Sequence, residues 1–282
     1  MATTLLAIDP SLAAPGYAVL DLSRAEPHLI AAGAWETAPD KNAESKSADM
    51  LRRVLYIWRE LRKVIALHQP QLIAIESGAG STNAKTAAAM ARASTVAACA
   101  ADEHLNGGAP IYITAMAAGA ALGIGVTQRA TKARPSAEEK AARKAAAERK
   151  KYLGGKRMAE LTPEEQAEKR ALTKGAAKKR DERKAAIAKA VVDRLGLARW
   201  ARALGLVDRA VSYDELVDPR WEGAHDAAAI ALVAWELPEV AAHRMVARQT
   251  TLAEIGGGRS VRAREGSGRV LYGGPPLDDE VV

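Results

Sequence analysis

The stretch TLLAID (residues 4–9) opens the chain with a short apolar run that ends in an acid. A turn follows at residues 10–16, and two further runs with strand character lie at residues 17–22 and 29–35. The short spacings between these three runs favour hairpins. The sequence therefore predicts that the chain begins with a meander of three strands.

The next segments alternate between helix and strand. Apolar residues keep helical spacing over residues 46–68, where Pro70 ends the pattern, and a small-residue helix is expected over residues 83–104. Strands are expected at residues 71–76 and 111–114, and a short helix at residues 115–122. This order predicts an α/β fold with a mixed sheet, whose antiparallel start lies beside a parallel continuation, flanked by helices.

Composition excludes several classes of protein. The chain has 282 residues, 48% of them hydrophobic and 27% charged, which suits a buried core. The single cysteine, Cys99, excludes a disulfide framework and a multi-cysteine zinc site. No run approaches 18 apolar residues, and the first residues lack the pattern of a signal peptide, so a cytoplasmic protein with no membrane contact is expected.

Positive charge is concentrated in one block. Residues 128–190 hold 20 Lys and Arg against 9 Asp and Glu, while the rest of the chain holds 21 against 25. Two capping boxes, Ser136 with Glu139 and Thr162 with Glu165, predict helix starts within the block. Neither helix has a continuous apolar stripe, so a projecting helical hairpin or a partly ordered arm is expected, followed by a separate helix over residues 181–195. Such a block fits a polyanionic partner or a solvated pair of helices.

Three acids stand out by position. Asp9 ends the first strand, Glu76 ends the fourth, and Asp226 lies in the first turn of a helix expected over residues 224–236. If the first and fourth strands are adjacent, the three carboxylates gather at one place and repel one another unless a cation shares them. Hard divalent ions such as Mg²⁺ prefer oxygen ligands, and a pair of them can promote in-line displacement at a phosphodiester.

Three motifs resemble those of the RuvC family of Holliday-junction resolvases. They are LAIDPS (residues 6–11) with PGYAV (15–19), LIAIE (72–76) followed by Asn83, and GAHDAAAIA (223–231). The last also resembles the third RuvC motif of CRISPR effector nucleases. The resemblance implies an RNase H-like nuclease domain formed by residues 1–127 and 180–250. Residues 128–179 are then a basic helical insertion, and residues 251–282 a flexible tail.

The resemblance also implies a function. A member of this family is a homodimeric, Mg²⁺-dependent endonuclease that resolves Holliday junctions, which are four-way DNA junctions, by paired symmetric nicks. Asp9, Glu76 and Asp226 then hold two metal ions per active site, with Mn²⁺ as a substitute, and cleavage leaves a 5′-phosphate and a 3′-hydroxyl.

The chain departs from the family pattern in several places: the basic insertion, a mild change at Ser11 of the first motif, and two positions that bear on the site. The family usually places a fourth acid or histidine where this chain has Gly223, and the neighbours His225 and Glu222 are candidate replacements, with His225 taken as catalytic. The family also often has a junction-opening aromatic where this chain has Ala79.

The resemblance suggests a set of nucleic-acid contacts. Lys184 is the best match for a phosphate-binding residue of the family, and the remaining candidates are Arg180, Arg183, Asn83, Lys85 and Arg92. Two alternatives stay open: a RuvC-like nuclease for other branched DNA or RNA, and a junction-binding protein that does not cleave. A nucleotide-using enzyme of the actin and sugar-kinase type is disfavoured, because no second phosphate motif is present.

Overall fold

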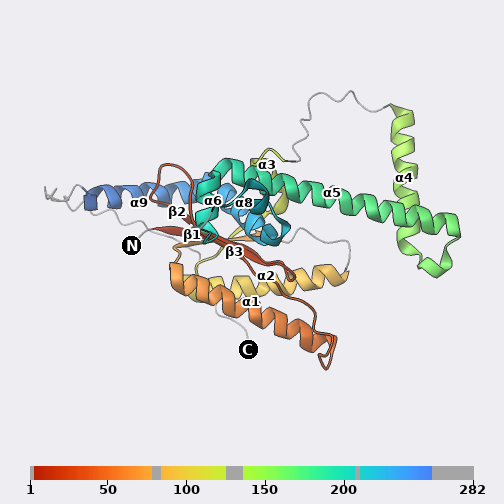
Figure 1. The fold of residues 1–282 in the computed structure, drawn as a ribbon, viewed down its shortest axis with the longest axis horizontal. Helices are drawn as coiled ribbons and strands as arrows, with labels where there is room; N and C mark the ends of the chain where they lie inside the picture. The colour runs from red at the N-terminus through yellow and green to blue at the C-terminus, as the bar shows by residue number, and fades with distance from the viewer. Residues whose placement is uncertain (1–2, 78–83, 125–135, 207–209, 256–282) are drawn as a thin grey trace, which may run out of the picture.

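Five strands form one sheet in the order β3-β2-β1-β4-β5 (Figure 1). The computed structural model describes residues 3–77, 84–124, 136–206 and 210–255. Strands β1, β2 and β3 pair antiparallel, and β4 and β5 join β1 in parallel. The strands are β1 (Thr4–Asp9), β2 (Gly16–Asp21), β3 (His28–Ala34), β4 (Leu72–Ser77) and β5 (Ile111–Thr114). The predicted mixed sheet is therefore confirmed, and its topology is that of an RNase H-like fold.

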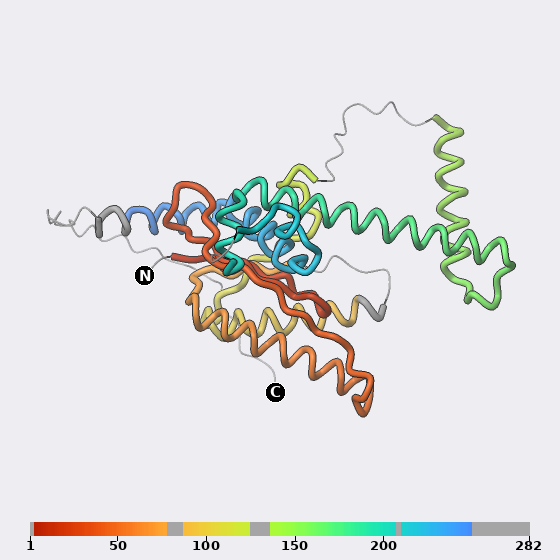
Figure 2. Tube along the Cα trace, in the orientation of Figure 1, coloured from red at the N-terminus to blue at the C-terminus, as the bar shows by residue number. Residues whose placement is uncertain are grey.

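The alternation of side chains along β1 divides the core into two layers. Leu6 and Ile8 pack with α1 (Lys46–His68) and α2 (Ala84–Leu105) on one face of the sheet. Leu5 and Ala7 pack with α8 (Glu222–Glu236) on the other face. Successive residues of a strand point to opposite faces, so both faces of this central strand are covered. Figure 2 shows α1 and α2 side by side beneath the sheet.

Helix α8 packs unusually closely on the sheet because its inner surface is small. Its buried residues are mostly alanine, and its start lies directly on the turn between β1 and β2. A Cβ atom built on Gly16 would lie 2.0 Å from the carbonyl carbon of Gly223, and one built on Gly223 would lie 2.4 Å from the Ala14 carbonyl oxygen. Glycine at both positions therefore permits this contact.

The remaining helices complete the α8 side and extend from it. Five of them, α3, α5, α6, α7 and α9, contribute buried side chains to the α8 layer. The elements are α3 (Ala115–Ala121), α4 (Ala137–Gly155), η1 (Met158–Glu160), α5 (Pro163–Leu195), α6 (Leu197–Ala203), α7 (Tyr213–Leu216), η2 (Pro219–Trp221) and α9 (Pro238–Ile255). No helix in these described ranges is long and apolar enough to cross a membrane.

The basic block forms an arm with a single long helix. Both predicted capping boxes are present, with Ser136 at the start of α4 and Thr162 at the start of α5. The prediction of a separate helix from residue 181 is wrong, because α5 runs unbroken over 33 residues. Residues 163–195 contain no proline after Pro163, and an isolated glycine such as Gly175 weakens a helix without ending it. Helix α5 leaves the core and carries α4 at its outer end (Figure 1).

Near the C-terminus, helix α9 extends to Ile255. Its last residues overlap the beginning of the segment predicted as a tail, and residues 256–282 lie outside the described part of the chain.

Candidate active site

Strand parity directs Asp9 and Glu76 to the same face of the sheet. In the parallel pair β1 and β4, Ala7 is opposite Ala74 and Ile8 is opposite Ile75, so Asp9 and Glu76 follow as neighbours. Ala7 and Ala74 belong to the core layer under α8. Residues two positions further along each strand point the same way, so both carboxyl groups emerge on the α8 side.

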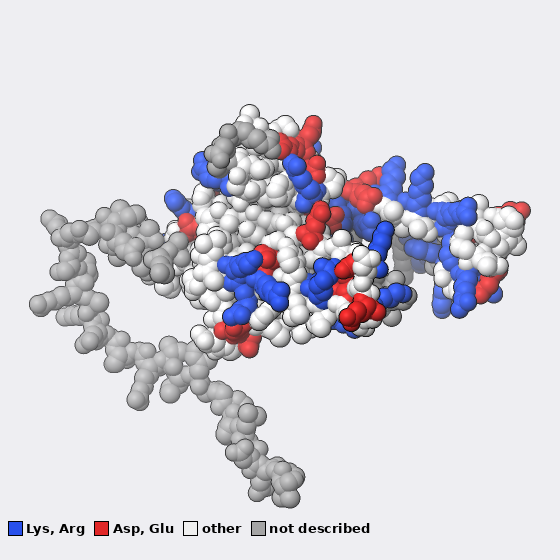
Figure 3. All heavy atoms as spheres, turned by 60° about the horizontal axis from the view of Figure 1, so that its bottom comes forward, with Lys and Arg blue, Asp and Glu red and all other residues white. Residues whose placement is uncertain are grey.

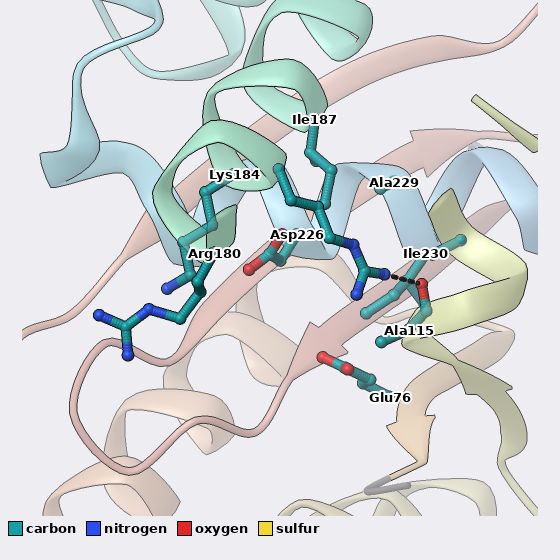
Figure 4. A pocket seen from close by; sticks show the side chains of 10 residues that line it. Glu76, Ala115, Arg180, Lys184, Ile187, Asp226, Ala229 and Ile230 are labelled. Carbon is teal, nitrogen blue, oxygen red and sulfur yellow. Dashed lines mark hydrogen bonds between the residues drawn. The ribbon is translucent and has the colours of Figure 1, made fainter. Parts of the chain in front are cut away.

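Helix α8 supplies the third carboxylate from above. Asp226 lies one turn into this helix, whose start is fixed against the β1–β2 turn by the close contact of Gly16 and Gly223. Asp226 and Glu76 line one cavity of about 140 Å³, whose opposite wall is α5 (Figure 4). The three acids, far apart in sequence, thus come together at one edge of the sheet.

The acids repel one another in a partly buried environment. Asp9 is buried, and this burial, followed by the negative charges of Glu76 and Asp226, raises its pKa well above the usual range. Burial also raises the pKa of the neighbouring Glu76. Burial and the charge of Glu76 raise the pKa of Asp226 to about 6. The cluster is therefore held at a cost in stability that a bound cation would offset.

Basic side chains lie beside the acids. Arg183, Lys184 and Arg180, all on α5, line the same cavity. The charges of Arg183 and Lys184 lower the pKa values of both Glu76 and Asp226, which opposes the effect of burial. Figure 4 shows Lys184 above Asp226, and Arg180 extending away from the two carboxylates.

Arg183 is fixed by a contact that sequence reasoning missed. Its Nη2 donates a hydrogen bond to the carbonyl oxygen of Ala115 at 3.0 Å, at the start of α3. The two residues are 68 positions apart, and a bond to a backbone carbonyl leaves no signal in the type of residue that provides it. The contact holds the guanidinium over the cavity and leaves its other nitrogens available.

The structure does not bring His225 to the carboxylates. Its side chain is 2% exposed, stacks on Trp200 at 5.0 Å, and its Nε2 donates to the Leu216 carbonyl oxygen at 2.8 Å. Burial lowers the pKa of His225 to about 4, so the ring is neutral at pH 7. Residues 225 and 226 are successive on a helix, so their side chains leave it about 100° apart. His225 therefore connects α8 to α6 and α7.

The other candidate for the fourth position pairs with a basic residue of the same cavity instead of joining the carboxylates. Glu222 forms an ion pair with Lys184. Gly223, which occupies the position itself, has no space for a side chain, because the turn at Ala14 and Gly16 lies against it. The absence of a fourth ligand there follows from the packing of α8.

The remaining predicted nucleic-acid contacts lie elsewhere. Arg92 is exposed on α2 and lines a groove with residues of α1, on the face of the sheet opposite α8. Asn83 lies outside the described residues, and Lys85 is described only as part of the α2 backbone.

The donor chemistry of the site fits a divalent cation. Among the described residues, no three Asp, Glu, His or Cys side chains are already arranged around a metal position. Three oxygen donors whose pKa values are raised by burial are nevertheless the ligand type that Mg²⁺ and Mn²⁺ prefer.

Fold and site together define an RNase H-like domain with a carboxylate cluster beside a basic helix. Comparison with known proteins is consistent with this class: residues 5–132 match the family model "Crossover junction endodeoxyribonuclease RuvC". The predicted resemblance to the RuvC family is thereby confirmed. The matched residues include Asp9 and Glu76 and end before Asp226.

Relatives and solved structures give the extent of this similarity. The chain is 36% identical over 100 residues to RuvC of Dehalococcoides mccartyi and 32% identical over 106 residues to RuvC of Chromohalobacter salexigens. These matches cover 36% and 37% of the chain, but only 56% and 53% of the relatives' lengths. A structure of "T. thermophilus RuvC in complex with Holliday junction substrate" aligns at 16% identity with a TM-score of 0.44, covering 82% of this chain and 92% of that one.

Proposed function

We propose that this protein is a divalent-metal-dependent endonuclease that resolves four-way DNA junctions. The observation that carries the proposal is the convergence of Asp9, Glu76 and Asp226 beside Arg183 and Lys184. Carboxylates next to cationic side chains suit a phosphodiester, whose charge the cations attract while the acids bind metal. The match of residues 5–132 to the RuvC family supports the same activity.

Each group in the site has a distinct proposed role. Asp9, Glu76 and Asp226 would hold two Mg²⁺ ions, with Mn²⁺ as a substitute. When bound, such a pair of ions would activate water for attack and stabilise the leaving oxygen of the phosphodiester. Lys184 and Arg183 would position the phosphate over the carboxylates, with Arg180 at the outer rim. His225 is proposed as a positioning residue, which orients α8 through Leu216 and Trp200.

Two copies of the chain are proposed to act on one junction. A resolvase must nick two symmetry-related strands of the junction. The described residues of one chain contain a single carboxylate cluster of this kind. A homodimer would present two such clusters with the two-fold symmetry that paired symmetric nicks require. The mass of the protein alone and bound to a junction, measured by light scattering, tests this stoichiometry.

The second candidate function is a junction-binding protein that does not cleave. The observation in its favour is Gly223, which leaves the site without a fourth ligand. Against it, one buried and two half-buried acids that repel one another are costly to keep without a cation.

Cleavage of a substrate panel tests these functions. A synthetic mobile four-way junction, a matched duplex, a flap, a fork and a structured RNA are each incubated with the protein in Mg²⁺, in Mn²⁺ and in chelator. Paired symmetric nicks confined to the junction and dependent on metal are expected. Cleavage spread over flaps, forks or RNA would indicate a general nuclease for branched substrates. Tight junction binding without cleavage in either metal would support the second candidate.

A further inference from the structure

The face of α5 that docks on the core continues outward as a basic face. Within the core, α5 buries Ile187, Ala188, Val191, Val192 and Leu195. Five turns of an α-helix take 18 residues, so positions 169, 170, 173, 174 and 177 lie on the same face further out. These positions are occupied by Lys169, Arg170, Thr173, Lys174 and Ala177. The stripe is therefore apolar where α5 meets the core and basic where α5 leaves it.

Helix α4 covers the acidic face of α5, and Lys169 donates to the Lys156 carbonyl oxygen at the end of α4, whereas Arg170, Lys174 and Lys178 stay exposed. Arg149 of α4 pairs with Glu165 at 3.2 Å and with Glu168 at 2.8 Å. Glu168 precedes Arg170 by two residues, a rotation of about 200° around the helix. Glu165 and Glu168 are thus neutralised on the side of α5 that faces α4. Figure 3 shows Lys and Arg side chains gathered along the projecting arm.

The basic face leads directly to the candidate active site. Lys184, one turn before the buried Ala188, lines the cavity that holds Glu76 and Asp226. From Arg170 to Lys184 the helix rises about 21 Å. One strand of duplex DNA carries about six phosphates over that length. A duplex arm that leaves the cavity along α5 would therefore meet Lys184 first and then Lys178, Lys174 and Arg170 further out. Asp181 and Glu182 interrupt the positive charge between these two parts, and Lys178 pairs with Glu182 at 3.8 Å.

The composition of the stripe fits phosphates and not a protein partner. Arg170, Lys174 and Lys178 follow one another at four-residue spacing and are exposed. Ala171 and Ala177, which flank these residues around the helix, are small and permit close approach of a backbone. Protein interfaces are anchored by aromatic and large apolar side chains, which this face does not present.

We propose that Arg170, Lys174 and Lys178 bind the phosphates of a duplex DNA arm whose strand enters the carboxylate cavity. The duplex arm as partner rests on the proposed nuclease function, whereas the phosphate stripe itself rests on the geometry of the arm.

The test compares two triple variants that remove equal charge from different faces of the arm. R170A/K174A/K178A removes the stripe. The control K140A/K144A/K151A removes three exposed lysines of α4, which lie on its side opposite Arg149. Binding to a duplex of about 30 base pairs is measured in chelator over a range of salt concentrations, where each lost phosphate contact lowers the salt slope by about 0.9.

The stripe variant is expected to lose about 2–3 from the salt slope and at least about tenfold in affinity at low salt, while the control changes much less. Equal losses in both variants, or none in the stripe variant, would overturn the proposal. Duplex binding in chelator does not depend on cleavage. If the stripe contributes to duplex binding but the wild type cleaves no junction, the proposed nuclease function is refuted and the proposed phosphate stripe is not. Cleavage by the wild type together with unchanged binding by the stripe variant would refute the stripe alone.

Discussion

At the scale of single residues, the candidate site combines groups that oppose one another. The charge of Asp226 is destabilised by burial and by Glu76, and is partly offset by Lys184 and Arg183. The close contact of Gly16 with Gly223 holds α8, and hence Asp226, in this position. The repulsion is thus maintained by the packing of α8 and not by local structure around each acid.

Removing the charge of Asp226 should stabilise the metal-free protein at neutral pH. The pKa of Asp226 is about 6 in the folded protein against 3.8 as its ordinary value, so the folded state holds the proton more tightly. The contribution of Asp226 to the free energy of unfolding is then highest below pH 3.8 and falls as the pH rises towards and through 6. We expect Asp226→Asn to raise the free energy of unfolding by about 1–3 kcal/mol at pH 7 in chelator, and to have little effect at pH 3.5.

Urea unfolding of both proteins at the two pH values measures this difference. Glu36→Gln, at an exposed acid, serves as the control and should change stability by less than about 0.5 kcal/mol. A destabilised Asp226→Asn protein at pH 7 would show that the acid is favourably paired in the fold.

His225 should matter for stability more than for chemistry. His225→Ala removes the hydrogen bond to Leu216 and the stacking on Trp200, and should cost about 2–4 kcal/mol of stability. Below its unfolding temperature, the variant should cleave junctions within about tenfold of the wild-type rate, because the ring does not reach the carboxylates. Full loss of cleavage at unchanged stability would instead indicate a catalytic histidine.

At the scale of helices and strands, the sequence predicts most of the fold that positions the acids. Each strand is a short apolar run between turn signals, and all five are found where expected. The pairing of β1 with β4, which brings Asp9 to Glu76, depends on contacts between residues far apart in the chain. The resemblance to a known family, and not local pattern, provided that step.

The parts that were not predicted are those that depend on tertiary contacts. Helices α6 and α7 lie in a region whose apolar residues show no clear helical periodicity. Trp200 of α6 is nevertheless fully buried and stacks on His225. A histidine next to a predicted catalytic acid gives no local sign of which way it points. The sequence does not reveal that α5 is continuous, because the charged residues around Asp181 resemble the start of a new helix. No residue there ends the preceding helix.

The contact between α8 and the β1–β2 turn gives an element-scale prediction. Gly223→Ala places a Cβ against the Ala14 carbonyl oxygen, so α8 must shift and carry Asp226 with it. We expect a loss of about 1–3 kcal/mol in stability, together with loss of cleavage.

Gly175→Ala is the matched control for this substitution. Its Cβ meets nothing within 4 Å on α5, and it should stabilise the protein by about 0.5–1 kcal/mol. Thermal unfolding of the two variants provides the comparison, and equal stability in both would contradict the close packing of α8.

At the scale of the whole molecule, charge and shape favour one direction of approach for the proposed DNA partner. The sheet and α8 present the acids at one edge, and α5 extends from that edge with basic residues at the cavity and again along its outer part. A long partner of negative charge would thereby be held outside the core while one phosphate enters it. On this proposal, binding of the partner depends on α5, whereas cleavage depends on the three acids.

The most direct test of the central claim is the cleavage of a mobile four-way junction by the wild type and by Asp9→Asn, side by side in Mg²⁺. Junction affinity is measured for both proteins in chelator. We expect the wild type to produce paired nicks and Asp9→Asn to be slower by about a thousandfold, with affinity unchanged within about threefold. An Asp9→Asn protein that cleaves at a rate close to that of the wild type would contradict the assignment of this cluster as the active site.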